Sequence, residues 1–183
     1  MKKPLILALL LLAAGILSAQ TISTRTGHIW FFSSTPLENI EAHNNQAAAN
    51  LNTQTGDMAF IVLMNGFQFE KAEMQKHFQE KYAESEKYPK STFSGKISNI
   101  GSVNFRKNGT YPVQVSGTMD LHGVKKPVSA NGSIIVLDGK IRATSKFQLA
   151  TADYNISIPA AVRDNIAKTL DVNVDVTYSP LNP

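Results

Sequence analysis

The strongest constraint on this chain is an alternation of apolar and polar side chains with a period of two residues. The alternation is clearest over 113–121, and it returns over 141–149 and 172–178. Because successive side chains of a β-strand point to opposite faces, each of these segments is predicted to be a strand with one buried face. Further strands are expected at 27–34, 40–51, 57–65, 91–100 and 128–137.

Short segments of turn chemistry separate the expected strands. They are Thr55-Gly56-Asp57, Asn108-Gly109, Gly123 and Asp138-Gly139. These residues tolerate a positive φ or close a hairpin, so they indicate a meander of about eight antiparallel strands. A sheet of that size with one apolar face must pack on a second sheet or close on itself.

Two helices are expected to interrupt the strands. The first lies within 70–85, where apolar side chains recur every four residues and the others are largely charged, which is typical of an amphipathic helix. Its apolar stripe, expected to be a packing seam, consists of Met74, Phe78 and Tyr82. A shorter helix is expected over about 159–168, because Pro159 is a favoured first residue and Val162 and Ile166 share one side. Both helices should cover openings or sides of the sheet.

The N-terminus has the features of a secretory signal peptide. Lys2 and Lys3 precede an unbroken apolar run over 5–17, and two small residues follow it. The run is shorter than the roughly 20 residues that cross a bilayer, and no second run follows, so no stable membrane anchor is expected. We therefore expect a signal peptide over 1–19 and one domain over 20–183, in a periplasmic or secreted protein.

Composition and motifs argue against several classes of function. The formal net charge is +4, a small excess to which the N-terminal lysines contribute, so nucleic acid is not an expected partner. The chain has no cysteine and therefore no disulfide. It contains no Gly-x-Ser-x-Gly, Ser-x-x-Lys, His-Glu-x-x-His or Walker motif, and no two histidines lie three to five residues apart. We expect no catalytic residues, no metal site and no cofactor, and the protein is not expected to be an enzyme.

Four motifs carry a resemblance to a known family. They are Met74–Phe78, Lys87–Gly95, Leu121–Val128 and Asp153–Ile156. In order and spacing they resemble the YceI-like family of bacterial periplasmic polyisoprenoid-binding proteins, over nearly the whole chain after the signal peptide. The resemblance implies a mostly β, lipocalin-like fold: one antiparallel barrel of about eight strands with two short helices. It also implies that the barrel binds a long-chain apolar molecule, a polyisoprenoid or another lipid, as a carrier or store.

Inward-facing residues of such a barrel are the candidate ligand contacts. We expect Phe60, Val62, Phe93, Ile97, Val115, Met119, Phe147, Leu149 and Tyr178 to line the interior. A barrel of eight strands either fills with its own side chains or holds one small ligand. The expected partner is thus an isoprenoid or fatty-acid-like lipid. A filled barrel with a non-catalytic interaction or structural role, an isomerase or hydrolase using the cavity, and a homodimer remain open alternatives.

Several other residues, in these motifs, in the first expected helix and near the hairpins, have plain structural interpretations. Gly123 should supply an unusual backbone conformation in a hairpin, and His122 is expected to bond to nearby backbone. Glu84 is expected to be solvated in the charged tail of the first helix. Four basic residues near hairpins are interpreted as solvated turn charges rather than contacts to an anionic head group. They are Lys125, Lys126, Lys140 and Arg142.

Overall fold

A computed structural model describes residues 21–179 and contains nine strands and one α-helix. The strands are β1 (Thr21–Ser34), β2 (Asn39–Asn52), β3 (Asp57–Leu63), β4 (Gln68–Phe69), β5 (Lys90–Ile97), β6 (Gly109–Leu121), β7 (Val124–Leu137), β8 (Lys140–Ala150) and β9 (Thr169–Tyr178). All eight strands expected from periodicity are confirmed, most of them longer than predicted. The short β4 is an addition.

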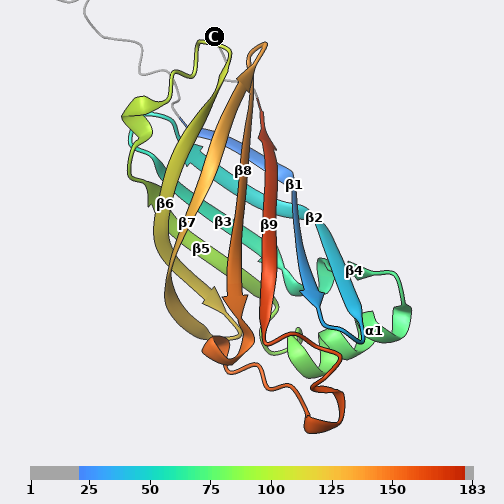
Figure 1. Ribbon diagram of the computed structural model, residues 1–183. Coiled ribbons are helices and arrows are strands. Elements are labelled where there is room, and N and C mark those ends of the chain that lie inside the picture. The colour runs from blue at the N-terminus through green and yellow to red at the C-terminus, as the bar shows by residue number, and fades with distance from the viewer. Residues whose placement is uncertain (1–20, 180–183) are drawn as a thin grey trace, which may run out of the picture.

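Eight of the strands close into a barrel. The order is β1-β9-β8-β7-β6-β5-β3-β2, and the pairing of β2 with β1 completes the ring (Figure 1). Every pairing is antiparallel. The short β4 pairs with Ala42 and His43 of β2, and β3 pairs with residues 48–51 of the same strand. Closure gives each of these strands a neighbour on both sides, although β7 pairs with β8 only over Gly132–Leu137. The predicted single antiparallel barrel of about eight strands is confirmed.

Alternation along each strand directs one set of side chains into the barrel. On β6, for example, Val113, Met119 and Leu121 are buried, whereas Gln114 and Thr118 are exposed. Burying the apolar set while leaving the polar set in water is the main reason for the strand register, because a slip of one residue would exchange the two faces.

A bulge in β1 allows two strands to approach closely. The pairing of β1 with β2 changes register on both sides of Gly27. A Cβ atom at this position would lie 2.6 Å from the Cγ1 atom of Val176 in β9, so only glycine fits without a shift. Bulges of this kind bend a strand and increase its twist, which helps a sheet of this size to close.

Two hairpin turns contain consecutive residues with positive φ. His122 and Gly123 have φ of 54° and 74° and join β6 to β7, and Asp138 and Gly139 have φ of 49° and 76° and join β7 to β8. Two-residue hairpins of this type require left-handed backbone at both positions. The predicted turn chemistry is therefore confirmed at both hairpins, including the special conformation of Gly123.

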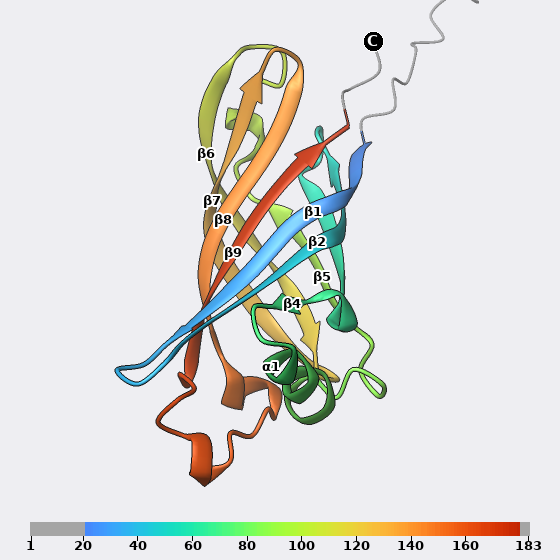
Figure 2. The same cartoon turned by 90° about the vertical axis from the view of Figure 1, so that its right-hand side faces the viewer.

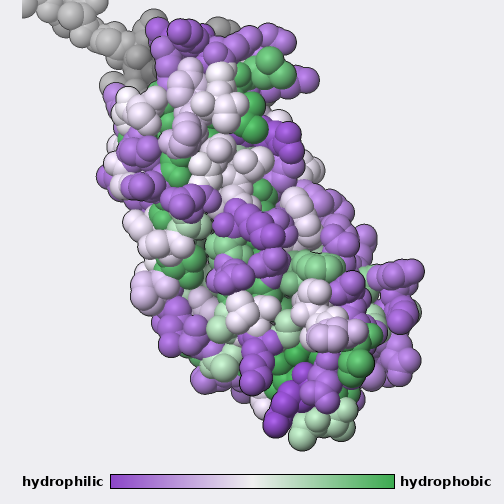
Figure 3. All heavy atoms as spheres, viewed as in Figure 1, coloured by the Kyte–Doolittle hydropathy of each residue, from purple (hydrophilic) through white to green (hydrophobic). Residues whose placement is uncertain are grey.

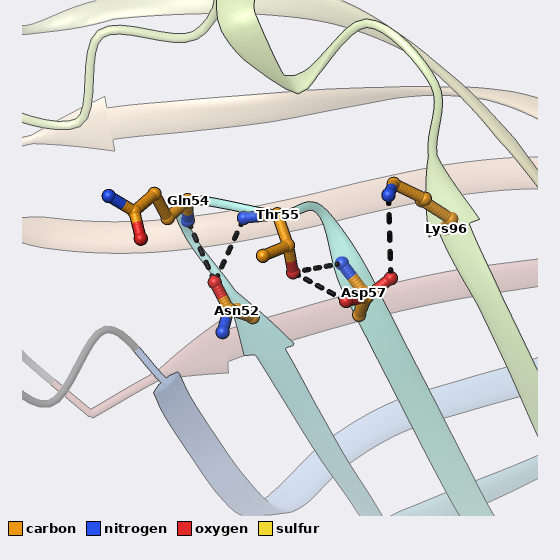
Figure 4. A network of polar contacts seen from close by, with 5 residues as sticks. All are labelled: Asn52, Gln54, Thr55, Asp57 and Lys96. Carbon is orange, nitrogen blue, oxygen red and sulfur yellow. Dashed lines mark hydrogen bonds and ion pairs between the residues drawn. The ribbon is translucent and has the colours of Figure 1, made fainter.

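The turn between β2 and β3 is held by side chains (Figure 4). The carboxamide oxygen of Asn52 accepts hydrogen bonds from the backbone N–H groups of Gln54 and Thr55, each at 2.9 Å. The Thr55 hydroxyl donates to Asp57 at 2.6 Å, and Lys96 of β5 approaches the same carboxylate at 3.8 Å. These contacts tie the β2–β3 turn together and link it to β5.

The first expected helix is confirmed in a shorter form. Helix α1 (Ala72–His77) continues into one π-helical turn, Phe78–Tyr82. Among the described residues, no helix is long and apolar enough to cross a membrane.

The prediction of a second helix is wrong. Within 159–168 the structure has only a 3₁₀ turn, Ala160–Val162. The remainder is held by bonds to the β1–β2 hairpin: Asn165 donates to Glu38 at 3.1 Å, and the Ala167 N–H donates to the Ser33 hydroxyl at 2.8 Å. The Ser33 hydroxyl accepts from a backbone N–H that a helix would have satisfied internally, and the side chain of Asn165 ties the segment to Glu38, so tertiary contacts override the local propensity.

The two ends of the barrel are packed differently. At one end, Leu51, Ile97, Ile134, Ile141 and Val176 are almost completely buried and form a solid core. The other end carries α1 and the segment 151–168, both at the bottom of Figure 2, and its apolar side chains form a second cluster. The interior space of the barrel lies toward this second end.

Candidate functional site

The barrel encloses an apolar cavity of about 460 Å³. The cavity reaches from the inward faces of the strands to α1, the π-helical turn and residues 156–166, so its mouth lies at the end that these segments cover. Its volume is within the range of roughly 300–1,000 Å³ that is usual for small-molecule sites. In the space-filling view the outer face is mostly hydrophilic, and hydrophobic side chains show between the polar ones, especially toward this end (Figure 3).

Eight of the nine side chains proposed from the sequence lie on the cavity wall. They are Phe60, Val62, Phe93, Ile97, Val115, Met119, Phe147 and Leu149. Alternation correctly assigned all of them to the inner face. Their contact with a ligand stays a prediction.

Tyr178 is the exception, because it lies in the solid core rather than on the cavity wall. Its side chain is buried, and its hydroxyl finds no hydrogen-bond partner within residues 21–179. Burial raises the pKa of this phenol well above its usual value. The prediction of an inward side chain was right, but its position near the end of β9 places Tyr178 beyond the cavity.

Glycines on adjacent strands make room for the aromatic ring of Phe93 on the cavity wall. Gly95 and Gly117 are paired across β5 and β6, and the ring of Phe93 lies over both. A Cβ atom at either glycine would come within 2.7 Å of the Phe93 Cζ atom. Phe60 meets the same ring edge-on, with 6.4 Å between ring centroids. The glycines therefore allow Phe93 to lie against the wall instead of filling the barrel.

Four phenylalanines cluster near the mouth. Phe31, Phe67, Phe69 and Phe78 have ring centroids 5.1 to 5.9 Å apart and all lie on the cavity wall. Sequence reasoning missed all four as site residues, and it assigned Phe78 only to a packing seam. The alternation of the first expected strand was a signal for Phe31, but Phe67 and Phe69 lie in a short connection with no clear period.

The stripe of α1 and the π-helical turn is a packing seam, and its three residues also form part of the cavity wall. Met74, Phe78 and Tyr82 all line the cavity. The helix is thus packed on the barrel by the same side chains that close one side of the mouth. Burial raises the pKa of the Tyr82 phenol above its usual value.

Polar side chains on the mouth come from two segments that meet there. Ser33 and Glu38 belong to the β1–β2 hairpin, and Asn165 belongs to the segment before β9. Glu38 accepts the hydrogen bond from Asn165, and Lys71 lies 3.8 Å from its other oxygen, on the solvent side. Glu38 is the only carboxylate among the described residues of the cavity wall.

His122 connects three segments instead of bonding to nearby backbone as expected. Its Nδ1 atom lies 3.1 Å from the carbonyl oxygen of Tyr154, and its Nε2 atom lies 2.6 Å from a carboxylate oxygen of Glu84. Tyr88 packs against the same ring, with centroids 4.4 Å apart. The expectation that Glu84 is merely solvated is therefore also wrong.

These contacts bring together three of the four motifs that carry the family resemblance. The motif residues His122 and Gly123 meet Tyr88 and Tyr154 at this point, where a Cβ atom on Gly123 would lie 2.7 Å from Tyr88. The cluster joins the β6–β7 hairpin to the end of the helical segment and to the chain after β8. These contacts tie the three segments together at the end of the barrel that contains the mouth.

Basic residues near the hairpins lie outside the cavity wall. Arg142 forms an ion pair with Asp175, and Lys126 lies 3.8 Å from Asp153. Lys125 and Lys140 are absent from the wall too. Within residues 21–179, no group of three or more His, Cys, Asp or Glu side chains is arranged to hold a metal ion.

A closed antiparallel barrel of eight strands around an apolar cavity defines the class of lipocalin-like proteins. The chain belongs to the YceI-like family, because the model of the YceI-like domain matches residues 18–178. The resemblance found in its motifs is thereby confirmed. No curated protein sequence matches the chain significantly.

Solved structures with the same fold come from several bacteria. A polyisoprenoid-binding domain from Saccharophagus degradans, implicated in plant cell wall breakdown, superposes with a TM-score of 0.76 at 16% identity, over 88% of this chain and 99% of that one. BcnA from Burkholderia cenocepacia gives 0.69 at 12% identity, over 84% and 96%. The YCEI protein of Campylobacter jejuni gives 0.55 at 13% identity, over 78% and 85%. At these identities the likeness shows the shared fold.

Proposed function

We propose that this protein binds one long apolar molecule, a polyisoprenoid or another lipid, inside the barrel and carries or stores it outside the cytoplasm. The observation that carries the proposal is the cavity of about 460 Å³ with an almost wholly apolar wall. The description of the similar Saccharophagus degradans domain as polyisoprenoid-binding supports it. A binding role rather than a catalytic one agrees with the lack of catalytic motifs in the sequence.

Burial of apolar surface supplies the binding free energy in such a site. Each buried methylene group contributes about 0.8 kcal/mol, so a long chain binds without any specific polar contact. An apolar cavity of this kind is also poorly suited to ordered water, because its wall offers few hydrogen-bonding partners. A lipid therefore competes only with weakly held solvent.

The binding proposal is tested by native mass spectrometry of protein purified without detergent, together with uptake of a fluorescent apolar probe. We expect a co-purifying hydrophobic molecule and saturable probe uptake. A barrel with no accessible interior would show neither.

A pair of variants localises the binding to the cavity. Met119→Glu places a carboxylate on the apolar wall, so probe uptake should fall by about tenfold or more. Thr118→Glu adds the same charge on the exposed face of the same strand and should leave uptake unchanged. Circular dichroism confirms that both variants are folded. Equal uptake in both would place the probe outside the cavity.

The export proposal depends on the N-terminal sequence, because residues 1–19 lie outside the described part of the chain. The basic residues and apolar run there support signal-peptide cleavage. N-terminal sequencing of the native protein should find a mature chain that begins near Gln20 in the periplasmic or secreted fraction. An intact Met1 in the membrane fraction would contradict export.

A further inference from the structure

The cavity wall has an uneven distribution of charge. Among the described residues that form it there is one carboxylate, Glu38, and no lysine or arginine. The remaining polar side chains are His77, the amide of Asn165 and several hydroxyls. An anionic group inside the cavity would therefore have no lysine or arginine on the described wall to pair with.

The polar end of a bound lipid must lie near Glu38. The inner end of the cavity is formed by Met58, Ile97, Val113 and Ile134, which belong to the solid core. The only carboxylate among the described wall residues lies instead at the mouth, together with the amide of Asn165, whereas the polar residues beside Ile134 on β7 and β8 are uncharged hydroxyls. A lipid whose chain occupies the apolar interior consequently places its head group at the mouth.

Glu38 is fixed in this position rather than free to turn away. Its side chain is 26% exposed, and Asn165 donates to one of its oxygens at 3.1 Å. Lys71 approaches the other oxygen only at 3.8 Å, and its own side chain is 66% exposed, so solvent screens this pair strongly. The carboxylate thus presents its charge to the mouth with weak compensation.

From this geometry we propose that the cavity selects lipids with an uncharged, hydrogen-donating polar end and rejects those that end in a carboxylate or phosphate, with Glu38 as the specificity-determining residue. A hydroxyl can donate a hydrogen bond to Glu38. A carboxylate or phosphate would instead meet a like charge in a partly desolvated site, where an unpaired charge is costly. This inference rests on the proposed lipid-binding function and narrows its ligand class.

Competition between two lipids of equal chain length tests the selection. The mature protein is loaded with the fluorescent apolar probe at pH 8. Hexadecanol, below its solubility limit, or palmitate, below its critical micelle concentration, then displaces the probe. Hexadecanol should act at a concentration at least about tenfold lower than palmitate. Displacement at equal concentrations, or preferential displacement by palmitate, would overturn the inference.

Matched variants assign the selection to Glu38. Glu38→Gln keeps an oxygen that accepts from Asn165 but removes the charge, so the preference should shrink to less than about threefold by improved palmitate binding. Glu41→Gln removes a half-exposed carboxylate of β2, three residues along the chain and outside the cavity, and should preserve the tenfold preference. An unchanged preference in Glu38→Gln would contradict the role of Glu38.

The same measurements separate this inference from the function on which it rests. If neither the probe nor either lipid binds, the lipid-binding proposal itself fails. If both lipids bind and palmitate binds as well as hexadecanol, lipid binding stands and only the selection against anions fails.

Discussion

Gly123 combines two constraints at one position, a left-handed backbone and a tightly packed neighbour. Its φ is +74°, and a Cβ atom would lie 2.7 Å from Tyr88. We expect Gly123→Ala to lower the free energy of unfolding by about 1–3 kcal/mol, measured by chemical denaturation.

Gly139 offers a control for the backbone contribution alone. It has nearly the same φ, +76°, but no atom lies within 4 Å of its Cβ position. Gly139→Ala should therefore destabilise the protein less than Gly123→Ala. Equal losses would show that the contact with Tyr88 contributes nothing.

His28 makes stability depend on pH. Its Nε2 atom lies 3.0 Å from the Nδ1 atom of His43, and burial together with that neighbour lowers the pKa of His28, against smaller opposing effects of Asp175 and Glu41. The unfolded chain thus takes up this proton at a higher pH than the folded chain does. The stabilising contribution is complete above the unfolded pKa of about 6.5 and is lost as the pH falls through the folded value.

The His28→Phe variant tests this effect, because it keeps an aromatic ring against Trp30 but cannot be protonated. Between about pH 7.5 and pH 5, the unfolding temperature of the variant should fall less than that of the natural protein. Thermal unfolding at a series of pH values measures the difference. Parallel curves would show that other groups account for the acid sensitivity.

At the scale of the element, Phe78 is one of the side chains that attach the helical segment to the barrel. This ring contacts Phe31, Phe67 and Phe69 at centroid distances of 5.1 to 5.7 Å. Phe78→Ala should cost about 2–3 kcal/mol locally and speed amide exchange over 72–82, with little change in the strands. Lys81→Ala, on the exposed side of the segment, should leave exchange unchanged. Equal effects of the two changes would contradict this attachment.

Strands and helices could be predicted where the sequence pattern that defines them is local. The strands follow from a two-residue period, which depends only on successive side chains pointing to opposite faces. The helix expected at 159–168 failed because Ser33 and Glu38 supply hydrogen-bond partners from more than 120 positions away. No window of sequence around that segment contains this information.

For the whole molecule, a ligand that binds only the folded barrel must also stabilise it. At a free lipid concentration of about 100 times Kd, linkage adds about 2.7 kcal/mol to the free energy of unfolding. Delipidated protein should therefore melt at a lower temperature, and added hexadecanol should raise the midpoint in a concentration-dependent manner. Scanning calorimetry measures this shift, with Met119→Glu as the control that should respond least. An unchanged midpoint at saturating lipid would contradict binding to the folded state.

The sequence by itself determined the strands, their inward faces, the hairpin turns and the family, because alternation, turn chemistry and motif spacing are local properties of the chain. Only the tertiary structure decided how far along the barrel axis each inward residue lies. It places Phe147 on the cavity wall and Tyr178 in the solid core. It also decided contacts such as that between Glu84 and His122, which are 38 positions apart. The physical reason is that the two-residue period determines which face of a strand a side chain lies on. How deep in the barrel that side chain lies, and which distant residues it contacts, depend on the register in which the eight strands pair as the barrel closes.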